Sequence, residues 1–185
     1  HTSFTNAITI EAWIYPTTIN SQLSYRAIYG AAQQYTFLAI KVVNSSPVLS
    51  LYINGTQRTL DSNYTLSLNN WYHIAGTWDS STGYMKIYVN GELKNTSASY
   101  TGALDVGSYS KYIAHGLYDS ADFVGRIDNL AIYSRAKTAE EIRKDYESFV
   151  LNTECEEGGN CTYGDKRVLA NVNYYYRLTA TTENG

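Results

Sequence analysis

Charged residues are scarce in this sequence, where Asp, Glu, Lys and Arg together make up 17% of 185 residues. Soluble domains usually carry about a quarter. The 14 Lys and Arg residues form no cluster, and the formal net charge is −3. A surface that binds nucleic acid needs a basic stripe to displace counterions from the phosphates. We therefore expect no nucleic-acid partner.

Long apolar runs are also missing. No segment reaches the roughly 20 apolar residues that a membrane-spanning helix needs, and none has the pattern of a signal peptide. We expect no transmembrane segment in this chain, and any targeting segment to have been removed or to lie outside it. With 44% apolar residues, the chain is too hydrophobic for a disordered protein. It is long enough for one sizeable β-sandwich, with or without an appendage.

Cysteine is limited to two residues, Cys155 and Cys161, in the Gly-rich segment CEEGGNC. Two thiols that close a small loop predict a disulfide and an oxidising compartment. Free thiols or half of a metal site are the alternatives, but zinc usually needs about four ligands and there is no second cysteine cluster. Five N-x-[ST] sequons also favour an extracellular setting. They lie at Asn44, Asn54, Asn63, Asn95 and Asn160.

Apolar and polar residues alternate with a period of two along most of the chain, which predicts an all-β fold. The opening strand has Ile8, Ile10, Ala12 and Ile14 on one side, and we expect it to end at Pro16. Further strands are predicted around residues 26–29, 35–43, 69–78 and 123–133. Asn54-Gly55 and Asn90-Gly91 each follow an alternating run. They predict hairpins with type I′ turns, because both central residues of that turn need positive φ.

A short helix is predicted before the last part of the chain. Thr138 can cap it, and Glu141 stands at the capping-box position. Ile142, Tyr146 and Phe149 recur at helical spacing and form its apolar stripe. We expect this helix to lie across one end of the sandwich. A second alternating segment, residues 168–180, predicts a long two-faced strand near the C-terminus.

Three segments resemble the laminin G-like and concanavalin A-like lectin domains, including the pentraxins. AITIEAWIYPTT resembles their opening tryptophan strand, NNWYHIAGTWDSSTGYMKIYVNGEL a central aromatic block, and VGRIDNLAIYSRAKTAEEI their closing strand and helix. The resemblance implies an antiparallel two-sheet jelly-roll β-sandwich with one short helix over residues 1–150. In residues 151–185, NYYYRLTATTENG resembles the F strand of fibronectin type III domains. We expect a disulfide loop and a strand that completes a sheet in cis or in trans, or the start of a further domain.

The acids needed for glycan cleavage are missing. Glucan-cleaving enzymes of related folds carry carboxylates alternating along one strand, as E-x-D-x-x-E, which places acid and nucleophile about 5 Å apart. Here Glu11 and Asp128 stand alone on their strands, and Glu140 and Glu141 belong to the helix start. His73 lies in an aromatic strand, where packing is the ordinary role of a histidine, and the chain has no nucleophile elbow. We expect no catalysis.

Structural calcium is the cofactor that the resemblance implies. Asp128, in RIDNLAIY, matches an acidic position that helps to hold Ca²⁺ in several laminin G-like and concanavalin A-like domains. A hard cation needs about six to eight oxygens, so carbonyls and other acids would have to join it. The alternative is that Asp128 caps a turn or pairs with Arg126 or another base.

Outward-facing tyrosines are the lead for glycan binding in a chain that contains 19 of them. The alternation places Tyr52, Tyr84 and Tyr88 on the outer faces of their strands, where flat rings can stack on sugars. The alternative is ordinary cross-strand packing, for which tyrosine is favoured. The three tryptophans are expected as anchors in the core or at its edge: Trp13, Trp71 and Trp78.

Two functions follow from these features. The first is a non-catalytic extracellular or cell-surface domain for adhesion, which binds a glycan or a surface protein. The second is a structural subunit of an extracellular filament or surface layer, in which an extended strand of one copy completes the sheet of the next. A glycosidase or lyase with a divergent site is the weakest hypothesis. The sequence itself names no ligand.

Overall fold

A computed structural model of the chain describes residues 6–18, 25–30, 36–43, 46–53, 58–102, 104, 111–115 and 122–149. The chain divides into two units, His1–Glu147 and Ser148–Gly185. Several predictions lie outside the described residues: the Cys155–Cys161 disulfide, the strand over residues 168–180, and the sequons at Asn44, Asn54 and Asn160. They remain predictions.

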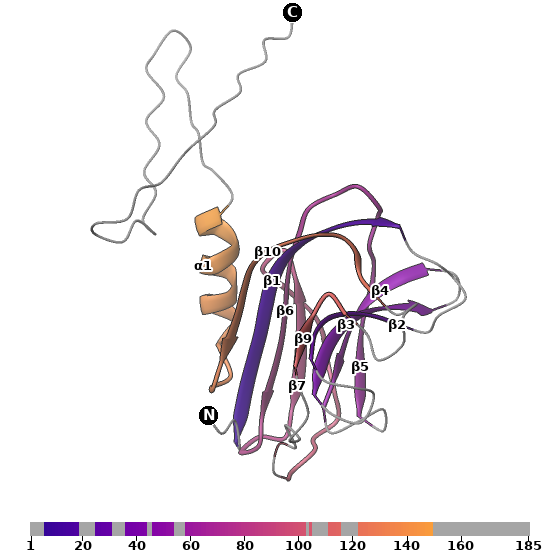
Figure 1. Ribbon diagram of the computed structural model, residues 1–185. Coiled ribbons are helices and arrows are strands. Elements are labelled where there is room, and N and C mark those ends of the chain that lie inside the picture. Colours follow the sequence, from indigo (N-terminus) through magenta and orange to yellow (C-terminus); the bar gives the residue numbers. More distant parts are fainter. Residues whose placement is uncertain are drawn as a thin grey trace, which may run out of the picture. The chain divides into compact units, whose positions relative to one another are not determined.

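Two five-stranded antiparallel sheets form a sandwich, which confirms the predicted all-β jelly-roll class (Figure 1). One sheet contains, in spatial order, β10 (Val124–Tyr133), β1 (Ala7–Thr18), β6 (Tyr72–Asp79), β7 (Met85–Val89) and β8 (Glu92–Thr96). The other contains β5 (Thr59–Thr65), β4 (Ser46–Tyr52), β3 (Phe37–Val43), β2 (Tyr25–Gly30) and β9 (Tyr112–Ile113). The described helix is α1 (Ala139–Phe149), and it is too short and too polar to cross a membrane.

The core lies between the two sheets and is built by the alternating residues of the strands. Ile10 and Ile14 of β1 have no exposed surface, and neither have Leu49 and Leu51 of the opposite sheet. Gly76 of β6 lets the sheets approach closely, because a Cβ added there would lie 2.9 Å from Leu51 Cδ1. The period-two pattern therefore predicts the inner faces correctly.

β1 runs two residues further than predicted, through Pro16 to Thr18. Its pairing with β6 ends at Ile14, while its pairing with β10 continues with Pro16 opposite Gly125. Beyond Ile14, the carbonyl of Pro16 accepts a hydrogen bond of 2.7 Å from the backbone N–H of Asn69. A proline is tolerated where a ladder ends or shifts register, as this one does after Pro16.

The hairpin between β7 and β8 has the predicted turn. Asn90 and Gly91 have φ values of 53° and 76°, so both central residues occupy the left-handed region that a type I′ turn requires. β4 and β5 are also paired as neighbours in an antiparallel hairpin. The predicted turn residues of that second hairpin, Asn54 and Gly55, lie outside the described residues.

Helix α1 begins with the predicted capping box. The backbone N–H of Glu141 donates to Thr138 Oγ1 at 3.2 Å, and the backbone N–H of Thr138 donates to Glu141 Oε2 at 2.8 Å. The predicted position of the helix is wrong, because α1 lies along the outer face of the sheet that contains β1 and β10, and not across one end of the sandwich (Figure 1). The reason is that β1 presents Glu11 and Trp13 on this outer face, and both contact residues of the helix or its start.

Candidate functional site

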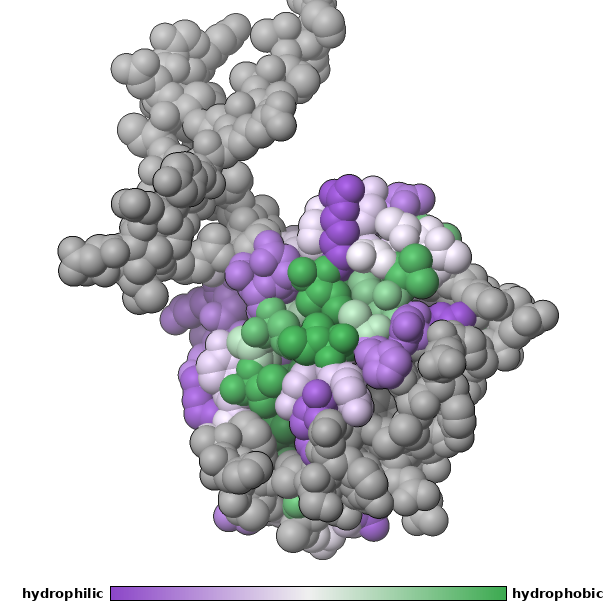
Figure 2. Space-filling view, viewed as in Figure 1, coloured by the Kyte–Doolittle hydropathy of each residue, from purple (hydrophilic) through white to green (hydrophobic). Residues whose placement is uncertain are grey.

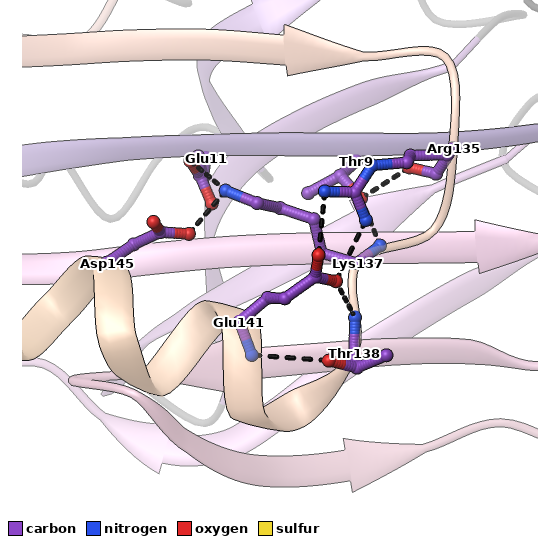
Figure 3. A network of polar contacts seen from close by, with 7 residues as sticks. All are labelled: Thr9, Glu11, Arg135, Lys137, Thr138, Glu141 and Asp145. Carbon is purple, nitrogen blue, oxygen red and sulfur yellow. Dashed lines mark hydrogen bonds and ion pairs between the residues drawn. The ribbon is translucent and has the colours of Figure 1, made fainter.

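A buried ion pair fixes the start of α1 to β1 (Figure 3). Lys137 Nζ donates to Glu11 Oε1 at 2.8 Å and also to Asp145 of the helix. The side chains of Lys137 and Glu11 are only 5% and 7% exposed. Burial lowers the pKa of Lys137, but hydrogen bonds to Asp145 and Glu11 outweigh it and raise the pKa above the usual value. The lysine is therefore charged at neutral pH and neutralises the buried carboxylate.

The connection between β10 and α1 is held by further polar contacts (Figure 3). Thr9 Oγ1 donates to the carbonyl of Arg135 at 2.7 Å and accepts from the backbone N–H of Lys137 at 2.9 Å. Arg135 pairs with Glu141 at 2.8 Å. The hydrogen bonds from Arg135 and from the Thr138 backbone lower the pKa of Glu141 to about 2. These contacts serve to position the helix, since each acid in them already has a cationic or backbone partner.

Aromatic residues continue the contact between α1 and the sheet. Tyr146 stacks on Trp13 with ring centroids 5.7 Å apart, and His73 of β6 lies 5.5 Å from Trp13. His73 is 3% exposed, and its Nδ1 has no hydrogen-bond partner among the described residues. Burial lowers the pKa of His73 to about 4. The negative charge of Asp145 opposes this shift, and the positive charge of Lys137 adds to it. His73 is therefore a neutral packing residue, as predicted from its aromatic strand.

His73 should make the protein sensitive to mild acid. As the pH falls from about 6.5 towards 4, the unfolded chain takes up a proton at this residue and the folded protein does not, so the free energy of unfolding falls. His73→Phe cannot bind a proton and should lose less stability than the wild type over this interval. Urea unfolding at several pH values measures the difference. Equal slopes for His73→Phe and the wild type would contradict the prediction.

The three tyrosines predicted as glycan contacts have different surroundings. Tyr84 is 43% exposed. Tyr52 and Tyr88 are 5% and 1% exposed, so the expectation that they face solvent is wrong. Tyr88 packs with Ala75 and with Ile142 of α1, because the helix covers this part of the outer face. Tyr52 lies on β4, an inner strand of its sheet that pairs with β3 on one side and β5 on the other.

Asp128, the predicted calcium ligand, is exposed on β10 and lies opposite Trp13 of β1. Its Oδ1 accepts a hydrogen bond of 2.8 Å from the backbone N–H of Asn129, which has a φ of 48°. Among the described residues, no three His, Cys, Asp or Glu side chains gather closely enough to hold a metal ion. Calcium binding at Asp128 therefore remains a prediction, and it would need further oxygens, such as backbone carbonyls.

Two of the five predicted sequons lie on described strands. Asn63 is exposed on β5. Asn95 is half-buried on β8, where its Nδ2 donates to the carbonyl of Asp61 at 2.8 Å. Asn63 therefore offers its amide nitrogen more freely than Asn95 does.

An exposed aromatic surface, which the sequence did not reveal, lies beyond the part of the sheet that α1 covers. We call it the Trp71 surface, and it consists of Tyr15, Trp71 and Arg126. The rings of Tyr15 and Trp71 lie 5.5 Å apart at 51°, and Arg126 Cζ lies 5.2 Å from the centre of the Tyr15 ring. Trp71 is 42% exposed, so the prediction that it belongs to the core or its edge is wrong, whereas Trp78 and Trp13 are 0% and 7% exposed. The clue in the sequence is that two asparagines precede Trp71, a turn signal that places it before the strand and not inside it.

Known proteins resemble this chain in sequence and in fold. The laminin G-type sequence model described as the concanavalin A-like lectin/glucanases superfamily matches residues 1–143. Pentraxin-related protein PTX3 of Mus musculus is 29% identical over 141 residues, which cover 71% of this chain and 36% of that protein.

Two solved structures extend the likeness. A protein from Bacteroides ovatus, provisionally described as carbohydrate binding, has a TM-score of 0.65 and 26% identity, covering 77% of this chain and 41% of that one. The heptameric SAP-like pentraxin of Limulus polyphemus has a TM-score of 0.57 and 18% identity, covering 78% of this chain and 71% of that one, and it shares the fold. The chain thus spans less than half the length of PTX3 and of the Bacteroides protein.

Proposed function

Because the chain belongs to the concanavalin A-like lectin/glucanase superfamily, we propose that it is a non-catalytic domain that binds carbohydrate outside the cell. The superfamily name joins two activities, binding and hydrolysis of glycans. The arrangement of acids in this chain favours binding. The extracellular setting is supported by the scarcity of charge and by the open sequon at Asn63.

The observation that carries the proposal is the state of the buried acid Glu11. Glycoside hydrolysis needs two carboxylates that flank one glycosidic bond, one of them free to donate a proton. Glu11 lies beneath α1 with Lys137 between it and Asp145, so a cation engages both carboxylates at once. Asp128 is exposed on a different strand and bonds its neighbour's backbone. These positions support a ligand-binding scaffold and not a hydrolytic centre.

A carbohydrate ligand is favoured over a protein by the relative from Bacteroides ovatus, whose provisional description is carbohydrate binding. An exposed aromatic ring on the sandwich adds physical support, since Trp71 leaves 42% of its surface open. Flat aromatic faces offer apolar area with little conformational entropy to lose on binding.

A glycan array tests the proposal directly. The 185-residue chain should bind at least one class among neutral, N-acetylated and acidic oligosaccharides, and incubation with the bound glycan should release no new reducing ends. Folded protein that binds no glycan would contradict the proposed ligand. Turnover of the glycan would contradict the non-catalytic role.

A second function, assembly by strand complementation, is favoured by the free side of β10. Among the described residues, this ten-residue strand pairs with β1 alone and so forms an edge of its sheet. Figure 2 shows hydrophobic residues gathered over the face where Figure 1 draws β9 and β10, and Ile113 and Val124 are 59% and 48% exposed. An open sheet edge can accept a further strand.

The strand that would pair with β10 is residues 168–180, from the same chain or from a neighbouring copy. Size-exclusion chromatography of the full chain should then give polymers or swapped dimers if pairing occurs between copies. Deletion of residues 168–180 should abolish these species. A monomer before and after the deletion, with glycan binding intact, would leave the carbohydrate-binding function and reject assembly.

A further inference from the structure

Trp71 stands at the end of an outer-face row that crosses three neighbouring segments. Arg126 of β10 is directly opposite Tyr15 of β1, and Trp71 precedes β6 on the other side of Tyr15. The next row inward holds Trp13 and His73, which α1 covers through Tyr146. The Trp71 surface is therefore the part of the aromatic outer face that lies next to the residues covered by α1 but is itself not covered by the helix.

Trp71 is held in place by its neighbours while its own surface stays open. One side contacts the Tyr15 ring at 5.5 Å, and the backbone of Asn69 is tied to Pro16 of β1 at 2.7 Å. The indole N–H has no hydrogen-bond partner in the described part of the chain, so it is available as a donor. A ring fixed in this way loses little freedom when a ligand stacks on it.

The polar groups around the indole suit an uncharged polyhydroxylated ligand. Arg126 lies over the Tyr15 ring, which fixes its guanidinium and its several N–H donors beside the aromatic pair. Asp128, which has the opposite charge, lies two residues along the same strand. Thr17 lies two residues after Tyr15 on β1, and its hydroxyl donates to the carbonyl of Val124 at 3.3 Å. Donors and acceptors thus flank one apolar face with no excess of either charge.

From this geometry we propose that Trp71 is the platform on which one neutral hexose ring stacks, with Arg126 donating hydrogen bonds to its hydroxyl oxygens. The inference rests on the proposed carbohydrate-binding function and names its site and ligand class. The C–H face of a hexose is apolar and its rim is polar, which matches an indole face with donors at its edge. A protein partner fits less well, because a stable interface covers about 800 Å² on each side, far more than one indole ring and its polar neighbours.

Tyr84 supplies a closely matched control, since it is 43% exposed against 42% for Trp71 but lies on another segment, next to β7. On the glycan array, Trp71→Ala should weaken binding of neutral hexose oligosaccharides at least about tenfold, as expected for a central aromatic contact. Tyr84→Ala should bind like the wild type. Arg126→Gln should weaken binding several-fold, and Trp71→Phe less than Trp71→Ala, with thermal melting used to check that each variant is folded.

The outcomes separate the site from the function. Wild-type binding that survives both Trp71→Ala and Arg126→Gln would overturn the Trp71 site and leave the carbohydrate-binding function standing. Equal losses for Trp71→Ala and Tyr84→Ala would also overturn it. Binding restricted to acidic sugars would overturn the neutral ligand class. If the folded wild type binds no glycan, the proposed function itself fails.

Discussion

Lys137→Met should lower the free energy of unfolding by about 3–5 kcal/mol, because it leaves the buried carboxylate of Glu11 without its cation. Lys137 is 5% exposed at its side chain and Glu11 is 7% exposed, so water cannot replace the lost partner. Glu11 Oε2 has no hydrogen-bond partner among the described residues, so the charge of this acid is balanced chiefly by Lys137. Urea or thermal unfolding at pH 7 measures the loss.

Two further variants distinguish a lost ion pair from a general loss of charge. Lys144→Ala removes a lysine of α1 that is 68% exposed and should change stability by less than about 1 kcal/mol. Glu11→Leu combined with Lys137→Met should regain most of the stability lost by Lys137→Met alone, because a buried ion pair can be replaced by apolar groups at little cost. A stable Lys137→Met variant, or a double variant weaker than the single one, would show that Glu11 is not stabilised as described.

Gly125→Ala should cost about 3 kcal/mol, near the upper end for single substitutions. A Cβ at this position would lie 2.2 Å from the carbonyl oxygen of Tyr15 and 2.9 Å from the ring of Phe123. The backbone φ of 157° is also one that residues with a side chain rarely adopt. β1 and β10 must therefore separate locally, which moves Arg126 away from Tyr15 and should weaken glycan binding as well.

The neighbouring Val124→Ala is the control for Gly125→Ala, because Val124 is 48% exposed on the same strand. We expect it to change stability by no more than about 0.5 kcal/mol and to leave binding unchanged. Thermal melting and the glycan array provide both readouts. A Gly125→Ala protein with the melting temperature of Val124→Ala would contradict the close contact between β1 and β10.

The strands and the helix were predictable because their signals are local. Alternation in β1 assigns Ile10 and Ile14 to the core, and Thr138 with Glu141 marks the helix start. The strand end predicted at Pro16 is two residues too early. A strand can contain a proline where its pairing allows it, and here that pairing is with β10, which lies far along the chain.

The exposed residues of the outer face could not be predicted in the same way. Tyr88 lies on β7 and Trp71 lies just before β6, and both are aromatic residues in alternating segments. Nevertheless, Tyr88 is 1% exposed and Trp71 is 42% exposed. The difference is the position of α1, which is fixed by the contact of Lys137 with Glu11, 126 residues apart in the sequence. Only the three-dimensional structure reveals which aromatic residues the helix covers and which it leaves open.

Nuclear magnetic resonance of the three tryptophan indole N–H groups would test the proposed binding surface most directly. With the protein labelled with ¹⁵N and the signals assigned by Trp71→Phe, a bound neutral oligosaccharide should shift the Trp71 signal and leave the buried Trp78 and Trp13 signals in place. A glycan that binds while the Trp71 signal stays unchanged, or that shifts Trp13 or Trp78 instead, would contradict stacking on the Trp71 surface.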